Sequence, residues 1–152
     1  MNYKKYNMAL FLIVLSMATI KPCYAIEPLS YKDDISPSLK VTLGAYLKDQ
    51  LKTDISLYTF APTDLNSDGQ DEYILKSKQC TEIENICKYL IFAEKKENIL
   101  LLLQNDVKDI MLAGTSSHGV KDILVFQNEK NDFNFDIYMW SPREKKYILS
   151  KE

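Results

Sequence analysis

The chain has 152 residues, of which 46% are hydrophobic and 26% are charged, with a formal net charge of −2. This length and balance fit one globular domain built around one core. An acidic chain with scattered lysines has no basic footprint, which excludes nucleic acid and anionic membrane surfaces as expected partners.

The first 25 residues have the pattern of a secretory signal peptide. Two lysines near the start precede an uncharged apolar run over residues 9–20, and small side chains at Cys23 and Ala25 occupy the positions that a signal peptidase reads. The run is shorter than the about 20 apolar residues that span a bilayer, which argues against an uncleaved anchor. The lysine and proline just before Cys23 argue against lipidation. We therefore expect cleavage after Ala25.

Cleavage would leave one mature domain, residues 26–152, with no linker or second domain. Removing 25 of the 152 residues leaves 127, and removing three lysines and no acid changes the net charge from −2 to −5. The mature protein would be periplasmic or secreted, with no stable membrane insertion after cleavage. Abundant Asn, Lys, Tyr and Ile indicate an AT-rich genome and hence a bacterial source.

One helix and then a series of strands are predicted. Ser36 suits a helix N-cap and Pro37 the first helical position, and leucines recur at helical spacing up to Leu51. The predicted strands are 72–77, 87–94, 98–104, 107–113, 121–127, 133–140 and 146–149. Short polar connections between them exclude crossover helices, so the sheet should be antiparallel. The predicted fold class is α+β: an N-terminal helix packed on an antiparallel β-meander, a blade-like open sheet.

The stretch DLNSDGQDEYIL, residues 64–75, predicts a calcium loop. Such a loop needs oxygen ligands at alternate positions and a glycine at the sharp turn, here Gly69. The expected ligands are Asp64, Asn66, Asp68, Gln70 through its backbone carbonyl, and Glu72. Leu75 stands where an EF-hand would have glutamate, so the loop is not an EF-hand. The alternative is a solvated turn, which the same residue types also favour. Calcium is the expected structural cofactor, with a dissociation constant of about 10⁻⁴ to 10⁻³ M.

This loop resembles the D-x-[DN]-x-D-G-x-x-[DE] loops of FG-GAP and integrin-α-like repeats. It is also similar to small exported bacterial proteins that carry one such loop, a cysteine hairpin and a later G-x-x-D-[IL]-[LIV]-V segment, here GVKDILV at residues 119–125. The resemblance implies calcium and a fold but no activity. Gly69 and Glu72 also recur as Gly119 and Asp122, fifty residues later. Two partial copies fall short of the four or more blades that close a propeller, so an open blade-like sheet is expected.

Two cysteines remain after cleavage, Cys80 and Cys87, between two predicted strands. In an oxidising compartment the expected outcome is a disulfide at the base of a hairpin loop. The alternative, a metal or redox pair, lacks both the four-residue C-x-x-C spacing and a nearby histidine.

Catalysis is not expected. His118 is the only histidine and follows Ser116 and Ser117 directly, without the G-x-S-x-G elbow or an orienting acid. The best carboxylate cluster would be used by the ion, although a calcium-dependent hydrolase stays an alternative. We expect instead a binding protein, an inhibitor or immunity-type partner of a periplasmic protein. The other non-enzymatic alternative is a structural or accessory subunit of an envelope assembly.

The strand FNFDIYMW predicts the surface for that partner. Its apolar series Phe133, Phe135, Ile137 and Met139 is expected to face the core, which places Tyr138 and Trp140 on the opposite side. With Tyr147 on the last strand, these two aromatic residues would form a partner-binding surface, since Tyr and Trp are enriched at interface hot spots. The alternative is that a neighbouring loop or the C-terminal segment covers them.

Overall fold

The computed structural model describes residues 26–95, 98–127 and 134–150. In chain order the elements are β1 (Ile26–Glu27), α1 (Pro37–Gln50), the 3-10 helix η1 (Ile55–Leu57), β2 (Tyr58–Thr63), β3 (Glu72–Ser77), β4 (Cys87–Lys95), β5 (Asn98–Val107), β6 (Asp109–Ser117), β7 (Val120–Phe126), β8 (Phe135–Ser141) and β9 (Lys146–Leu149). The predicted signal peptide, including Cys23, and the strand residue Phe133 lie outside the described residues.

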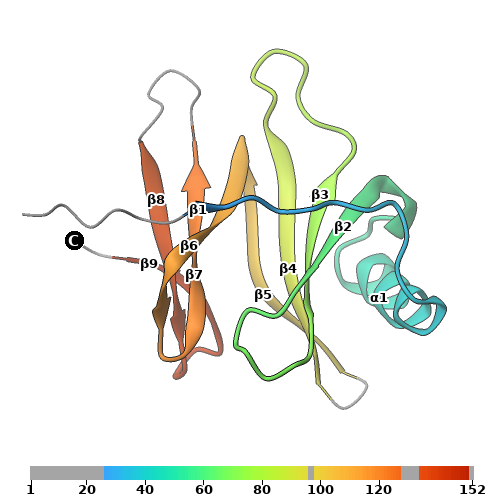
Figure 1. The fold of residues 1–152 in the computed structure, drawn as a ribbon. Helices are drawn as coiled ribbons and strands as arrows, with labels where there is room; N and C mark the ends of the chain where they lie inside the picture. The colour runs from blue at the N-terminus through green and yellow to red at the C-terminus, as the bar shows by residue number, and fades with distance from the viewer. Residues whose placement is uncertain (1–25, 96–97, 128–133, 151–152) are drawn as a thin grey trace, which may run out of the picture.

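The strands form two antiparallel sheets (Figure 1). One has four strands in the order β2-β3-β4-β5, and the other has five in the order β1-β6-β7-β8-β9. The chain passes between the sheets at Lys108, the single residue between β5 and β6. The prediction of one helix on a single meander was therefore wrong: the described part of the chain is mostly β, with one short α-helix.

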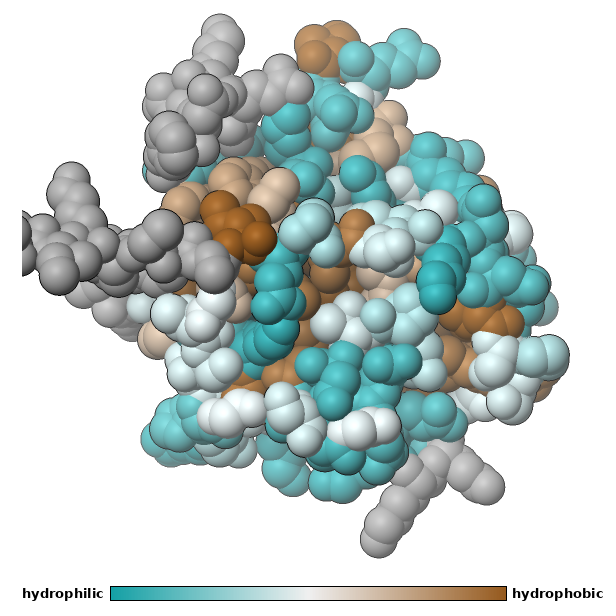
Figure 2. Space-filling view, in the orientation of Figure 1, coloured by the Kyte–Doolittle hydropathy of each residue, from teal (hydrophilic) through white to brown (hydrophobic). Residues whose placement is uncertain are grey.

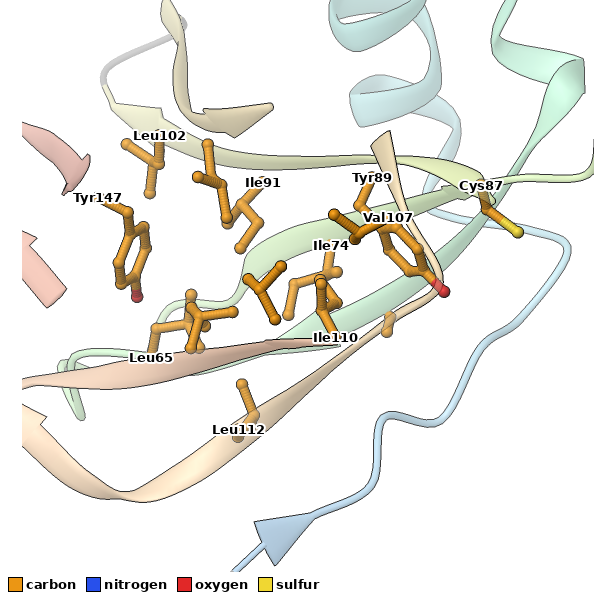
Figure 3. Close-up of a cluster of buried hydrophobic side chains, with 14 residues drawn as sticks. Leu65, Ile74, Cys87, Tyr89, Ile91, Leu102, Val107, Ile110, Leu112 and Tyr147 are labelled. Carbon is orange, nitrogen blue, oxygen red and sulfur yellow. The ribbon is translucent and has the colours of Figure 1, made fainter. Parts of the chain in front are cut away.

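Three layers result, because the four-stranded sheet is covered on both faces. On one face Leu39, Leu43 and Leu47 of α1 form a buried cluster with Leu75 and Leu90 of the sheet. Side chains of the two sheets form the second cluster, which Figure 3 shows converging between the layers. The middle sheet carries continuous apolar runs such as Tyr89–Phe92, all buried, as expected for strands covered on both sides.

The helix begins where the sequence predicts. Ser36 is the N-cap, and its hydroxyl accepts a hydrogen bond from the backbone N–H of Leu39 at 3.4 Å. Pro37 is the first helical residue. The helix ends at Gln50, and Lys52 beyond it has a positive φ of 54°, a conformation that stops helix propagation. This helix is not long and apolar enough to cross a membrane, and neither is any other in the described part of the chain.

The faces of β8 are the reverse of those expected. Tyr138 and Trp140 pack against the cluster between the two sheets. Since side chains alternate along a strand, Ile137 and Met139 point to the outer face of the five-stranded sheet.

Figure 2 shows the exterior of the molecule, where hydrophilic side chains cover most of the visible surface between smaller hydrophobic areas.

The predicted disulfide is confirmed: Cys80 and Cys87 are bonded, with their Cα atoms 4.3 Å apart. They close the loop between β3 and β4, at the end of these strands opposite the loop of residues 64–71 (Figure 1).

Candidate metal centre

The predicted calcium loop joins β2 to β3 and is fixed at its base by strand pairing. Thr63 pairs with Glu72, so residues 64–71 form a closed hairpin connection. Ser67 and Gly69 have positive φ angles of 59° and 83°, which turn the chain sharply within the loop. Gly69 is the residue expected at this turn.

Leu65 anchors the loop to both sheets. Its side chain is buried in the cluster between the sheets. Its carbonyl oxygen accepts a hydrogen bond from the backbone N–H of Lys121 in β7, at 2.7 Å. A loop held by a buried side chain and a backbone bond has less freedom to lose when it binds a ligand.

The polar side chains of the loop turn inward and bond to its backbone. The two carboxylate oxygens of Asp64 accept from the N–H groups of Asp68 and Gly69, at 3.2 and 3.0 Å. Asn66 Oδ1 accepts from the Asp68 N–H at 2.9 Å, and Asp68 Oδ1 from the Gln70 N–H at 2.8 Å. These are Asx-type turns, in which a short polar side chain replaces a backbone acceptor.

Two carboxylates converge on one point. Asn66 Nδ2 donates to Asp68 Oδ2 at 3.1 Å and to Glu72 Oε1 at 3.2 Å. The other oxygen of Glu72 accepts from the backbone N–H of Leu65 at 2.8 Å. The amide of Asn66 therefore occupies the position between two negatively charged groups.

Glu72 is the unusual member of this group, because it is only 8% exposed. Burial raises the pKa of its carboxyl group, and the negative charges of Asp68 and Asp64 raise it further, while the hydrogen bond from Leu65 opposes them. The two charged groups that raise the pKa of Glu72 are both carboxylates. A buried carboxylate with like-charged neighbours is costly unless a cation compensates it.

The donor set fits calcium better than a transition metal. Calcium takes six to eight oxygen ligands from carboxylates, amides and backbone carbonyls, all of which this loop contains. Each carboxylate has about four lone-pair sites, so the two hydrogen bonds that each of these groups accepts leave room for a cation. Within residues 26–95, 98–127 and 134–150, no three Cys, His, Asp or Glu side chains are already assembled around a common point. Binding would therefore require the loop side chains to reorient.

A cavity of about 470 Å³ lies beside the loop. Its lining includes Asn66, Asp68 and Glu72 on the polar side and Leu100, Leu102 and Trp140 on the apolar side. This cavity brings one of the predicted partner-binding residues, Trp140, next to the predicted metal ligands. The sequence pattern did not indicate that association.

The other two aromatic residues of the predicted surface point into the protein. Tyr138 Oη accepts a hydrogen bond from Asn105 Nδ2 of β5 at 3.2 Å. Tyr147 is buried, and its hydroxyl donates to the carbonyl of Lys121 at 2.9 Å. Burial raises the pKa of Tyr147, as do the charges of Glu72 and Asp122. Trp140 is half-buried and packs edge-to-face on Tyr147, with ring centroids 5.8 Å apart. The three residues do not form one exposed patch, and their part in partner binding stays a prediction.

His118 has a conformational role. The pairing of Ser117 with Val120 leaves His118 and Gly119 as the two turn residues of the β6–β7 hairpin. Both have positive φ, 54° and 80°. Two-residue hairpin turns of this kind need left-handed residues.

Asp122 is a residue to which the sequence pattern assigned no role. In the described part of the chain, Glu72 and Asp122 are the two buried charged side chains. Asp122 is 4% exposed, and Thr115 Oγ1 donates to its Oδ2 at 2.7 Å. Among the described residues its Oδ1 has no hydrogen-bond partner. The internal repeat did place Asp122 opposite Glu72, but it gave no reason to expect that Asp122 is buried.

Comparison with known proteins finds no matching family model, no curated relative and no similar solved structure.

Proposed function

We propose that the protein is an exported, non-catalytic binding protein that holds a structural calcium ion in the loop of residues 64–72. Its action would be to bind another protein, as an inhibitor or immunity-type partner. The observation that carries the calcium assignment is the burial of Glu72 next to two other carboxylates. A divalent cation would convert this unfavourable cluster into a stabilising one.

The ligands would be Asp64, Asn66, Asp68, Glu72 and the backbone carbonyl of Gln70. Asn66 would have to turn its amide so that the oxygen replaces the nitrogen between Asp68 and Glu72. That rotation is tolerated by the backbone, because the Asp68 N–H has a second acceptor in Asp64 Oδ1 at 3.2 Å. Bound calcium would fix the loop and one wall of the cavity beside it.

A binding role agrees with the architecture of this chain. A three-layer core with a disulfide gives a rigid support for surface loops, which are the usual carriers of binding residues. The net charge of −5 expected for residues 26–152 would favour association with a basic partner. Export itself is inferred from residues 1–25, whose removal after Ala25 can be measured by mass spectrometry of secreted material.

Thermal unfolding tests the calcium assignment. A ligand that binds only the folded state stabilises it by about 1.4 kcal/mol at ten times its dissociation constant and about 2.7 kcal/mol at a hundred times. For a domain of this size those values correspond to a rise in Tm of about 5–10 °C. We expect that rise when 10 mM calcium is added to chelator-treated protein, and no rise in Asp68→Asn.

Asp71→Asn is the matched control. Asp71 lies in the same loop and has the same charge, but it occupies a position that supplies no ligand. It should retain the calcium response of the wild type. An equal response in Asp68→Asn and Asp71→Asn would mean that calcium acts by general screening, and the assignment would fail.

A further inference from the structure

A second feature of the molecule has the properties of a recognition element: the loop of residues 80–87 between β3 and β4. It lies at the end of β3 and β4 opposite the loop of residues 64–71, which contains the proposed calcium ligands (Figure 1). The disulfide between Cys80 and Cys87 closes it at the base. Cys87 is also the first residue of β4 and is buried in the core, so one end of the loop is fixed to the sheet.

Hydrogen bonds inside the loop fix its conformation further. The N–H of Thr81 donates to the carbonyl of Ile86 and the N–H of Asn85 to the carbonyl of Thr81, both at 2.9 Å. The N–H of Ile86 donates to Thr81 Oγ1 at 3.0 Å. Asn85 adopts a positive φ of 51°, which reverses the chain. The loop is thus preorganised, so binding through it costs little conformational entropy.

The tip of this loop presents an isolated hydrophobic side chain. Ile83 is 97% exposed, the largest exposure among the large hydrophobic residues in the described part of the chain. The next in that group is Val41 on the helix, at 75%. Figure 2 shows a hydrophobic projection at the top of the molecule, where Figure 1 places the β3–β4 loop. Its sequence neighbours, Glu82 and Glu84, are both exposed.

We propose that the loop of residues 80–87 is the partner-recognition element, and that it inserts Ile83 into an apolar pocket of a protein whose pocket rim is basic. This inference rests on the proposed function as a protein-binding molecule and specifies the surface and the partner. Ile83 supplies the apolar anchor, and Glu82 and Glu84 supply the charge that a basic rim would complement. Electrostatic complementarity of this kind directs encounter and orientation more than it adds affinity.

Single exposed hydrophobic residues are common on protein surfaces and usually need no explanation. Ile83 differs because the chain holds it away from the protein on a closed loop. A hollow of about 470 Å³, which Leu51, Leu57 and Ile86 help to line, lies beside the loop, but Ile83 is not among the residues that line it. The disulfide and the internal hydrogen bonds fix the loop in a conformation in which Ile83 is exposed, as is required of an anchor residue.

The experiment begins by finding the partner and continues with affinity measurements on it. The mature protein, immobilised, is exposed to the exported proteins of the source organism, and bound proteins are identified by mass spectrometry. The purified partner is then titrated by surface plasmon resonance against the wild type, Ile83→Ala, Ile83→Glu and the double variant Cys80→Ser/Cys87→Ser. Val41→Glu is the matched control, because it places the same charge at another exposed apolar position.

We expect Ile83→Ala to weaken binding by about 30-fold or more, the effect of removing an interface hot spot. Ile83→Glu should abolish binding. The double cysteine variant keeps Ile83 but loses preorganisation, so it should bind about tenfold more weakly. Val41→Glu should bind like the wild type. Glu82→Gln/Glu84→Gln should lower the association rate and its dependence on salt. Thermal melting of each variant verifies that it is folded.

Three outcomes would overturn the proposal. If a partner binds Ile83→Glu as tightly as the wild type, the partner docks elsewhere; loss of its binding in Asp68→Asn would then place the interface at the calcium loop and leave the proposed function intact. If Val41→Glu loses binding as fully as Ile83→Glu, the loop has no special role. If no exported protein binds the wild type, both this proposal and the proposed binding function fail, while the calcium assignment is judged by its own titration.

Discussion

Replacing Glu72 by glutamine removes one negative charge from the loop while keeping the shape of the side chain. The glutamine side chain could still accept the hydrogen bond that the Leu65 N–H donates to Glu72 Oε2. In the absence of calcium, the substitution should therefore increase the stability of the folded protein at neutral pH. In the presence of calcium it should do the reverse, because it removes one of the proposed charged ligands.

The size of the effect follows from the geometry. Glu72 Oε1 and Asp68 Oδ2 lie 3.2 and 3.1 Å from the same nitrogen, so the two oxygens are at most about 6.3 Å apart. Two unit charges at that distance repel by about 0.7 kcal/mol in water and about 2.6 kcal/mol at an effective dielectric constant of 20. Burial adds to this penalty, and the weaker hydrogen bond of a neutral acceptor offsets about 1 kcal/mol. We expect a net gain on the order of 1–2 kcal/mol.

The gain should depend on pH in a definite direction. The pKa of Glu72 is raised above its ordinary value of 4.5 in the folded state. Its contribution to stability is therefore fully present below pH 4.5 and is lost as the pH rises through the raised folded pKa. Wild-type protein in chelator should lose stability over that range, whereas Glu72→Gln should not. The free energy difference between them should thus be small at pH 4 and largest at pH 7–8.

Urea unfolding followed by Trp140 fluorescence measures this difference directly, since Trp140 is the only tryptophan of the chain. The titration is run from pH 4 to pH 8, in chelator and in 10 mM calcium, with Asp71→Asn as the control for a general change of charge. A difference between wild type and Glu72→Gln that stays constant across this pH range would refute the reasoning. So would equal stabilisation of both proteins by calcium.

The remaining predictions concern the supports of the fold. Replacing Cys80 and Cys87 by serine should lower the free energy of unfolding by about 2–3 kcal/mol, measured by urea titration, because the disulfide closes a short loop; no loss would show that the bridge does not constrain the unfolded chain. Gly44→Ala should raise the Tm, corresponding to about 0.5–1 kcal/mol, since the added Cβ would lie at an ordinary contact distance of 3.6 Å from Ile55; a lower Tm would indicate a clash. Tyr147→Phe should cost about 1 kcal/mol by removing a buried hydroxyl that donates to a backbone carbonyl; an unchanged stability would mean that water satisfies that carbonyl equally well.

Local chemistry predicted several features of the fold correctly. Ser36 and Pro37 marked the start of the helix, because capping and the fixed φ of proline act within one turn. The disulfide between Cys80 and Cys87 was predicted correctly, because these are the two cysteines that remain after the expected cleavage. The turn at Gly69 was also predictable, since a positive φ favours glycine.

The two-sheet arrangement was missed because it depends on contacts between distant segments. Strand β2 contains Pro62, which lacks a backbone N–H and so reads as a strand breaker, but β2 is an edge strand where proline is tolerated. The continuous apolar run of β4, Tyr89–Phe92, is typical of a strand covered on both faces, a signal that the predicted fold did not use. A single meander with a helix on one side cannot cover both faces in this way.

The orientation of β8 could not be decided from its sequence. Ile137 and Met139 alternate with Tyr138 and Trp140, so both faces of the strand carry large apolar or aromatic groups. Alternation defines the two faces but not which of them meets the other sheet. The pairing of Tyr138 with Ile123, a core residue of β7, decides it in the folded protein.

Isothermal titration of calcium into chelator-treated protein tests the central claim most directly. We expect one calcium ion per chain with a dissociation constant of about 10⁻⁴ to 10⁻³ M, no binding by Asp68→Asn, and unchanged binding by Asp71→Asn. Absence of measurable binding in the wild type, or equal binding by Asp68→Asn, would contradict the calcium assignment and leave residues 64–72 as a hydrogen-bonded turn.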